Sequence, residues 1–219
     1  MSNLLRVRWF NLALRLGIGE PDAEEVWRGL AAAYGESGRF YHNLNHIQHA
    51  LAIAEQLQEV ATDFTAVQLA LWFHDVVYDP RRSDNEAQSA AYADAVLLPL
   101  GVPDDLLAKV RGLILATQTH EAAADDPDVW VILDADLAIL SAPPAQYDAY
   151  ARAIRQEYSF VPDAAYVVGR TAVLQKFLAR SPFYLTAWMR ELRDTAVYKN
   201  LSRELAELNK RDTENGEKK

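Results

Sequence analysis

Apolar side chains recur along most of this chain about every 3.6 residues, whereas the period-two alternation typical of a half-buried strand is scarce. A segment with the longer period collects its apolar side chains on one face of a helix. Half of the residues are apolar (50%), which is enough for a sizeable core. The sequence therefore predicts an all-α fold: a single globular domain of about ten helices over residues 1–209, because glycine, proline and capping residues divide the pattern about that often.

Local signals give approximate boundaries for these helices. Asp22 with Glu25 resembles a capping box, Asn43 or Asn45 could cap the third helix, and Asp63 precedes the fourth. The segment 129–133 could be a short strand, but the residues after it favour a helix. The predicted helices cover residues 4–16, 22–34, 43–60, 64–79, 85–98, 104–119 and 129–140, followed by three that begin near Pro143, Pro162 and Pro182, the last running towards Leu208.

Charge and cysteine content limit the partners. The 31 acidic and 22 basic residues give a net charge of −9, which argues against nucleic acid and anionic membranes as partners, because both need clustered Lys and Arg. No cysteine is present, so a metal ion would have to be held by His, Asp or Glu. No apolar run approaches the length of a signal peptide or a membrane span, so we expect a cytoplasmic protein. The charged segment 210–219 predicts a disordered tail.

Histidines gather in two places along the chain. His42, His46 and His49 are four and three residues apart, so on one helix they would lie within about 60° of one another. His74 and Asp75 are adjacent in the middle of the most apolar predicted helix, 64–79. Taken by itself, His74 is most simply a core histidine that forms a hydrogen bond with a backbone carbonyl. His42 and His49 are most simply solvated side chains, or side chains that orient a metal ligand.

Two further acids, Asp134 and Asp136, lie in the apolar segment VILDADLAIL. A buried carboxylate is costly unless it is paired or bound to a cation, although Asp134 could also be a helix cap. Together with His46 and the His74–Asp75 pair, these acids indicate a common divalent partner. Imidazole and carboxylate ligands suit Mn, Fe, Co, Ni or Zn.

The order of these residues resembles the HD superfamily of metal-dependent phosphohydrolases, in particular a bacterial subgroup of predicted HD-domain hydrolases. The resemblance spans roughly residues 39–205. It implies an HD-domain-like helical fold in which one divalent ion (Mn, Fe, Co, Ni, Zn or Mg) activates water to cleave a phosphoester or phosphoanhydride bond. By position, the ligands would be His46, His74, Asp75 and Asp136. The blocks that carry the resemblance are YHNLNHI (41–47), WFHDVVYD (72–79) followed by DNE (84–86), and LDADL (133–137).

The chain departs from the family at one position. Several relatives carry a Glu four residues after the ligand histidine, and here that residue is Tyr78. Asp79 or Glu86 could supply the missing catalytic carboxylate, and we favour Glu86. The alternative explanation for Glu86 is a first-turn Glu stabilised by the helix dipole.

Substrate phosphates need cationic or polar partners. A surface position or an ion pair would also explain each arginine and lysine, and His120 could instead interact with the end of its own helix or hold a second metal. The candidates for binding substrate are Arg81, Arg82, His120, Arg170 and Lys176, together with Arg39 and Arg155.

These observations favour a hydrolase acting on a small phosphorylated molecule, in the first place a nucleotide. Two alternatives stay open: a di-iron oxygenase of the HD fold, using His42, His49, His120 or Glu86 as additional ligands, and a non-catalytic sensor that binds a nucleotide. The partly apolar helix 4–16 could support a homodimer or close its own core.

Overall fold

The computed structural model describes residues 2–122 and 125–216, with side chains for 3–122 and 125–210. Over these residues the protein contains ten α-helices, two short 3-10 helices and no strand, which confirms the all-α prediction. The chain divides between Asp136 and Leu137 into two compact units. Whether the chain behaves as a single domain remains a prediction.

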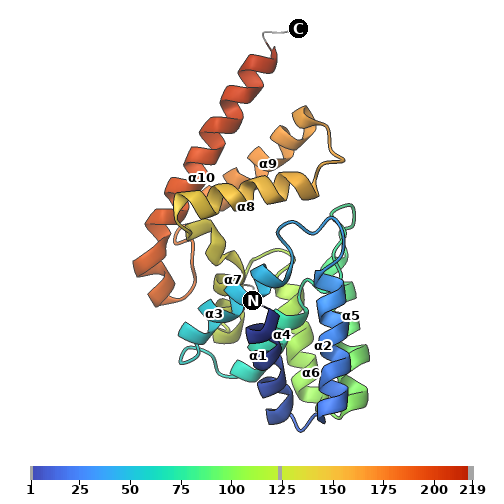
Figure 1. Ribbon diagram of the computed structural model, residues 1–219. Coiled ribbons are helices and arrows are strands. Elements are labelled where there is room, and N and C mark those ends of the chain that lie inside the picture. The colour runs from blue at the N-terminus through green and yellow to red at the C-terminus, as the bar shows by residue number, and fades with distance from the viewer. Residues whose placement is uncertain (1, 123–124, 217–219) are drawn as a thin grey trace. The chain divides into compact units, whose positions relative to one another are not determined.

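The first unit is built around α4, which packs against α3, α5, α6 and α7 (Figure 1). The helix is apolar on nearly all sides, and its residues from Leu69 to Phe73 are fully buried, as predicted. Trp72 meets the edges of Trp9 and Trp27, with ring centroids 5.9 and 6.2 Å apart. The elements of this unit are α1 (Ser2–Arg15), α2 (Glu20–Tyr34), α3 (Leu44–Gln56), α4 (Phe64–Phe73), α5 (Asn85–Leu97), η1 (Leu98–Leu100), α6 (Asp104–Ala116) and α7 (Pro127–Asp136).

Two of the predicted caps are confirmed and one is wrong. Asn43 caps α3 by accepting a hydrogen bond from the Asn45 N–H at 2.9 Å, and Asp63 caps α4 in the same manner. The capping box at Asp22 is wrong, because α2 already begins at Glu20. Pro21, whose φ is preset for a first helical turn, starts the helix earlier and leaves Asp22 inside it.

α1 turns one face into the core of its own unit. Leu5, Trp9 and Leu12 are buried on that face, whereas Leu4 and Leu14 on the other side are exposed. One of the two uses suggested for this helix, closing its own core, is therefore present. A homodimer remains a prediction.

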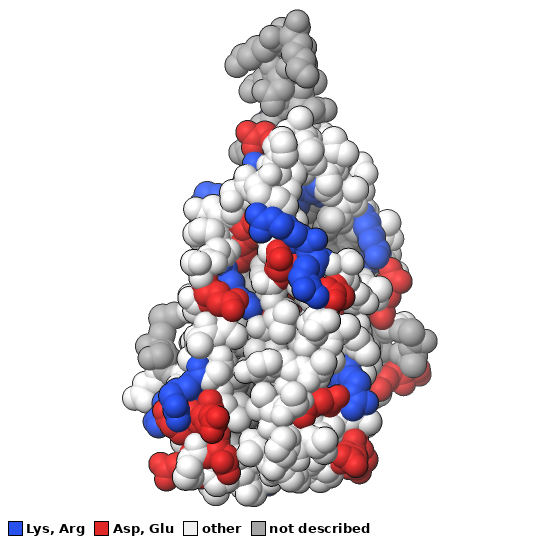
Figure 2. Space-filling view, turned by 90° about the vertical axis from the view of Figure 1, so that its right-hand side faces the viewer, with Lys and Arg blue, Asp and Glu red and all other residues white. Residues whose placement is uncertain are grey.

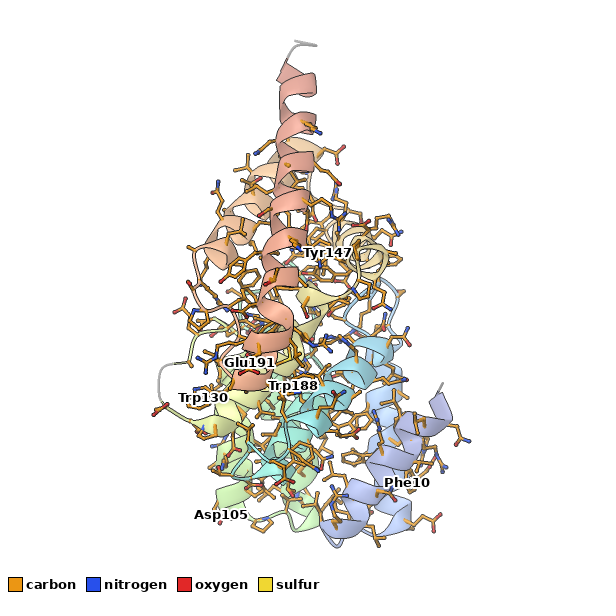
Figure 3. All side chains as sticks on the ribbon, turned by 90° about the vertical axis from the view of Figure 1, so that its left-hand side faces the viewer. Phe10, Asp105, Trp130, Tyr147, Trp188 and Glu191 are labelled. Carbon is orange, nitrogen blue, oxygen red and sulfur yellow. The ribbon has the colours of Figure 1, made fainter. Side chains whose placement is uncertain are left out.

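The second unit contains η2 (Leu137–Ser141), α8 (Pro144–Glu157), α9 (Asp163–Leu178) and α10 (Ala187–Gly216). α10 packs against α9 and η2, and Tyr147 of α8 lies beside α10 (Figure 3). The segment 129–140 is helical, so the strand alternative is wrong. A helix start at Pro182 is also wrong, because the Asp194 carboxylate accepts hydrogen bonds from the backbone of Phe183 and Tyr184 and holds this stretch as a loop.

The last helix extends into the charged C-terminal segment. α10 continues to Gly216, well into the stretch 210–219 that was expected to be disordered, while residues 217–219 lie outside the described residues.

Acidic and basic side chains are intermixed on the face shown in Figure 2. Ion pairs at the surface of the first unit include Arg82–Asp84 (2.7 Å) and Arg111–Asp94 (2.8 Å), which solvent screens. None of the described helices is both long and apolar enough to cross a membrane.

Candidate metal centre

Three helices of the first unit, α3, α4 and α7, contact one another and carry the predicted ligands (Figure 1). His46 lies in the first turn of α3, His74 and Asp75 directly follow α4, and Asp136 is the last residue of α7. His46 and His74 are almost completely buried, with 3% and 1% of their surface exposed. The structure therefore brings all four predicted ligands to one place in the interior.

The nitrogen and oxygen atoms of these side chains converge. His46 Nε2 lies 3.1 Å from His74 Nε2 and 3.2 Å from Asp136 Oδ1. Asp75 Oδ2 lies 3.0 Å from His74 Nε2 and 3.5 Å from His46 Nε2, and the His74–Asp136 separation is 3.4 Å. The donor atoms of His46, His74 and Asp136 all lie within 4.8 Å of one another, so this group could hold a metal ion.

These spacings fit a transition-metal ion. Donors held about 2.1 Å from a common centre lie about 3.0 Å apart at octahedral angles and about 3.4 Å apart at tetrahedral angles. Five of the six pairs among the four donors are 3.0–3.5 Å apart, so these pairs are already as close as a shared ion would hold them. Asp75 is not part of the group whose donor atoms all lie within 4.8 Å of one another, so its carboxylate lies near the two imidazoles and farther from Asp136.

The hydrogen bond on the far side of His74 strengthens this conclusion. His74 Nδ1 lies 3.0 Å from the Leu71 carbonyl oxygen. Because a carbonyl oxygen can only accept a hydrogen bond, Nδ1 carries the ring proton and donates it. In the neutral ring, Nε2 then carries a lone pair, and that lone pair faces two carboxylates and a second imidazole. Such a group of acceptors is stable only with a proton or a cation among them. Ligand histidines commonly use a backbone carbonyl in this way.

The electrostatics of the group agree with this description. Burial lowers the pKa of His74, but the carboxylates of Asp75 and Asp136 outweigh it and raise the pKa well above its usual value. Burial raises the pKa of Asp136, but hydrogen bonds from His120 and His46 lower it well below its usual value. Burial also raises the pKa of Asp75, but the charges of His74 and His42 lower it well below its usual value. Both acids are therefore held ionised in the interior by positive charge beside them.

His46 is held differently from His74. Its Nδ1 is buried and has no hydrogen-bond partner in the described part of the chain. The ring instead packs against Tyr41, with centroids 4.9 Å apart.

α4 ends earlier than predicted, at Phe73 rather than at residue 79. His74 and Asp75 are therefore not in the middle of a helix, as expected, but in the irregular turn after it. In a continuing helix, the carbonyls of Trp72 and Asp75 would accept hydrogen bonds from backbone N–H groups of the next turn. Here they accept from side chains instead, from Tyr34 Oη and from Arg39 respectively. In a regular helix, two adjacent side chains point about 100° apart. The turn instead allows the side chains of His74 and Asp75 to face the same point.

The expectation of one helix face for three histidines is also wrong. α3 begins at Leu44, so His42 precedes the helix, and its ring stacks on Tyr78 with centroids 4.2 Å apart. His49 lies on α3 but is not among the residues whose donor atoms converge, and neither is the buried Asp134.

His120, a candidate for binding substrate, lies beside one of the predicted metal ligands. Its Nε2 lies 2.9 Å from Asp136 Oδ2, the carboxylate oxygen not directed at His46. The backbone of His120 has φ = 53°, a left-handed conformation that is uncommon outside glycine. The contact with Asp136 was missed, because the two residues are 16 positions apart and no local pattern joins them.

The two candidate catalytic carboxylates do not join the group. Asp79 accepts a hydrogen bond from the Arg81 N–H at 2.9 Å, and Asn85 bonds both backbone groups of Asp79. Glu86 lies in the first turn of α5. Among the described residues, no hydrogen bond or ion pair connects Asp79 or Glu86 to the converging ligands.

Most of the predicted phosphate-binding cations are engaged elsewhere. Arg81 and Arg82 are exposed beside Asp79 and Asp84, at 3.8 and 2.7 Å. Arg39 is buried and bonds backbone carbonyls rather than facing solvent.

The remaining cations belong to the second unit. Arg170 is buried and bound to both oxygens of Glu204, at 2.8 and 3.0 Å. Arg155 donates to the carbonyls of Tyr158 and Val161, and Lys176 is exposed on α9.

Comparisons with protein-family models, with curated proteins and with solved structures found no match to this chain. The resemblance to the HD superfamily therefore stays a prediction carried by the three sequence blocks.

Proposed function

We propose that this protein is a metal-dependent phosphohydrolase that acts on a small phosphorylated molecule, in the first place a nucleotide. The observation that carries the proposal is the buried convergence of His46, His74 and Asp136, with the Asp75 carboxylate within 3.5 Å of both imidazoles. Two imidazoles and two carboxylates leave ligand positions for water and a phosphate oxygen on a six-coordinate ion.

His46, His74, Asp75 and Asp136 would hold the ion, which when bound would supply a Lewis acid for the phosphoryl oxygen and for the attacking water. The side chains then have separate tasks. The Nδ1–H of His74 donates a hydrogen bond to Leu71 O, so that Nε2 stays directed at the proposed metal position. The charges of Asp75 and Asp136 offset that of the cation, and His120 orients the second oxygen of Asp136. Glu86 or Asp79 would orient or deprotonate the water.

The test begins with metal analysis by plasma emission spectrometry, on protein purified without chelator or nickel resin. We expect about one Mn, Fe, Co, Ni or Zn per chain, and hydrolysis of a nucleotide or another phosphoester in a screen with that ion. Asp136→Asn should lose the ion, whereas Asp134→Asn, which alters a buried acid of the same helix, should retain it. Metal-loaded protein that binds nucleotides without hydrolysing any would support the sensor instead.

One observation favours a second candidate, the di-iron oxygenase. Asp136 directs Oδ1 at His46 and His74 and Oδ2 at His120, so the carboxylate could bridge two ions. Two irons per chain, together with oxygen consumption, would place this candidate first. One ion of any kind would exclude it.

A further inference from the structure

Arg39 occupies an unusual position for an arginine. Its side chain is only 3% exposed and lies between the rings of Tyr34 and Tyr78, with the guanidinium carbon 5.4 and 5.6 Å from the ring centroids. It precedes α3 in the sequence, yet its guanidinium reaches the turn that follows α4.

The hydrogen bonds of Arg39 join two segments that carry proposed ligands. Nη1 donates to Asp75 O at 2.6 Å and Nη2 to Val76 O at 2.8 Å. Nη1 also donates to His42 O at 3.3 Å, in the segment that leads into α3 and His46. One planar group therefore fixes the distance between the two segments.

The local backbone explains why this connection is needed. The turn after α4 leaves carbonyls that no following helical turn binds, and an unbound buried carbonyl costs about 1–3 kcal/mol. Tyr34 donates a hydrogen bond to the carbonyl of Trp72 at 2.9 Å, and Arg39 donates to the carbonyls of Asp75 and Val76 in the turn. A cation at the carboxyl end of a helix is also favoured by the helix dipole.

We infer that Arg39 is a positioning residue for the metal centre, acting through the backbone of Asp75 and Val76 rather than through substrate. This inference rests on the proposed function, because it requires that the four side chains hold a metal ion. Lysine cannot replace the guanidinium, since a single ammonium group lacks the fixed fork that reaches two carbonyls and a third oxygen together. The effect of Arg39 is therefore on donor geometry and metal affinity.

The experiment compares Arg39→Lys with the full wild-type chain by titrating the apoprotein with Mn²⁺ and Co²⁺. Arg8→Lys is the matched control, because Arg8 is partly buried in the same unit and pairs with Glu55 of α3, without touching the turn after α4. We expect Arg39→Lys to weaken metal binding about 10- to 100-fold, the usual cost of losing a group that orients a ligand. Arg8→Lys should bind as the wild type does.

Two further measurements separate positioning from simple destabilisation. The visible spectrum of bound Co²⁺ should change in Arg39→Lys at a temperature where circular dichroism shows the variant fully folded. Tyr34→Phe, which removes only the bond to Trp72 O, should shift affinity in the same direction by less.

The outcomes are distinct. Wild-type affinity and an unchanged Co²⁺ spectrum in folded Arg39→Lys would overturn the role of Arg39 while leaving the proposed function intact. Wild-type protein that binds neither ion would overturn both.

Discussion

Each unit of this protein buries a group of ionisable side chains, and the two groups differ in whether they are complete. In the second unit, Arg170 forms two hydrogen bonds with Glu204, and Tyr147 Oη donates to the same carboxylate. One positive and one negative charge cancel, and each donor has an acceptor. In the first unit, two carboxylates face two imidazoles, and the converging Nε2 of a neutral His74 carries no proton, because its proton lies on Nδ1.

The difference teaches that buried charge alone does not mark a functional site. Breaking a closed pair is costly, but the pair itself needs nothing more. A group with a surplus of acceptors is stable only when a proton or a cation joins it. This criterion separates Asp75 and Asp136 from Glu204, although all three are acids in a protein interior.

The largest expected effect is on the open group. Asp75→Ala should abolish metal retention while most of the helical circular dichroism remains, because it removes a ligand that lies outside any helix. Metal content per chain is the measurement. Asp79→Ala alters an acid four residues further on and should leave the metal bound. Full metal content in Asp75→Ala would remove the distinction between the two groups.

The closed group should respond in stability and not in metal content. Glu204→Gln should lower the free energy of unfolding by about 3–5 kcal/mol, because it leaves Arg170 buried without its counter-charge. Urea denaturation measures this change. Glu207→Gln, which alters an exposed acid on the same helix, should change the free energy by about 0.5 kcal/mol or less. A loss of bound metal in folded Glu204→Gln would contradict the independence of the two groups.

A third variant tests which carboxylate serves the proposed reaction. Glu86→Gln should keep its metal and slow turnover about 10²-fold, as expected for loss of a general base. Steady-state kinetics with the substrate found in the phosphoester screen would measure it. If Asp79→Asn shows that loss and Glu86→Gln does not, the two roles are exchanged.

The smallest effect concerns pH. Burial would raise the pKa of Asp128, but hydrogen bonds from Lys109 and Thr62 outweigh it and lower the pKa. The stabilisation is therefore present above the unfolded-state pKa of about 3.9 and is lost as the pH falls through the lower folded-state value. Asp128→Asn should flatten the acid limb of stability against pH in thermal unfolding between pH 2 and 4. An unchanged acid limb would contradict this assignment.

The sequence predicted those features that depend on neighbouring residues. The caps at Asn43 and Asp63 are local, and so is the all-round apolar character of α4 that places it in the core. The four converging residues came from motifs, because geometry cannot be calculated from spacing across separate helices.

The features that the sequence did not predict depend on contacts between distant segments. α4 stops at Phe73 because side chains from residues 34 and 39 bind its last carbonyls and the turn after it. The contact of His120 with Asp136 is of the same kind. From the sequence, Arg170 is a candidate phosphate-binding residue, because it is a cation on an otherwise apolar helix. Its partner Glu204 is 34 residues away, so only the fold shows that the two are paired.

The unequal support of the two imidazoles has a consequence for metal selectivity. The His74 ring is fixed by a hydrogen bond at Nδ1, whereas Nδ1 of His46 has no such bond and its ring packs against Tyr41 and His42. One ligand is therefore rigid and the other adjustable. A small movement of the His46 ring would accommodate ions of different radius, so we expect Mn²⁺, Co²⁺ and Zn²⁺ all to bind, with affinities that follow the intrinsic order of these ions rather than a preference imposed by the protein.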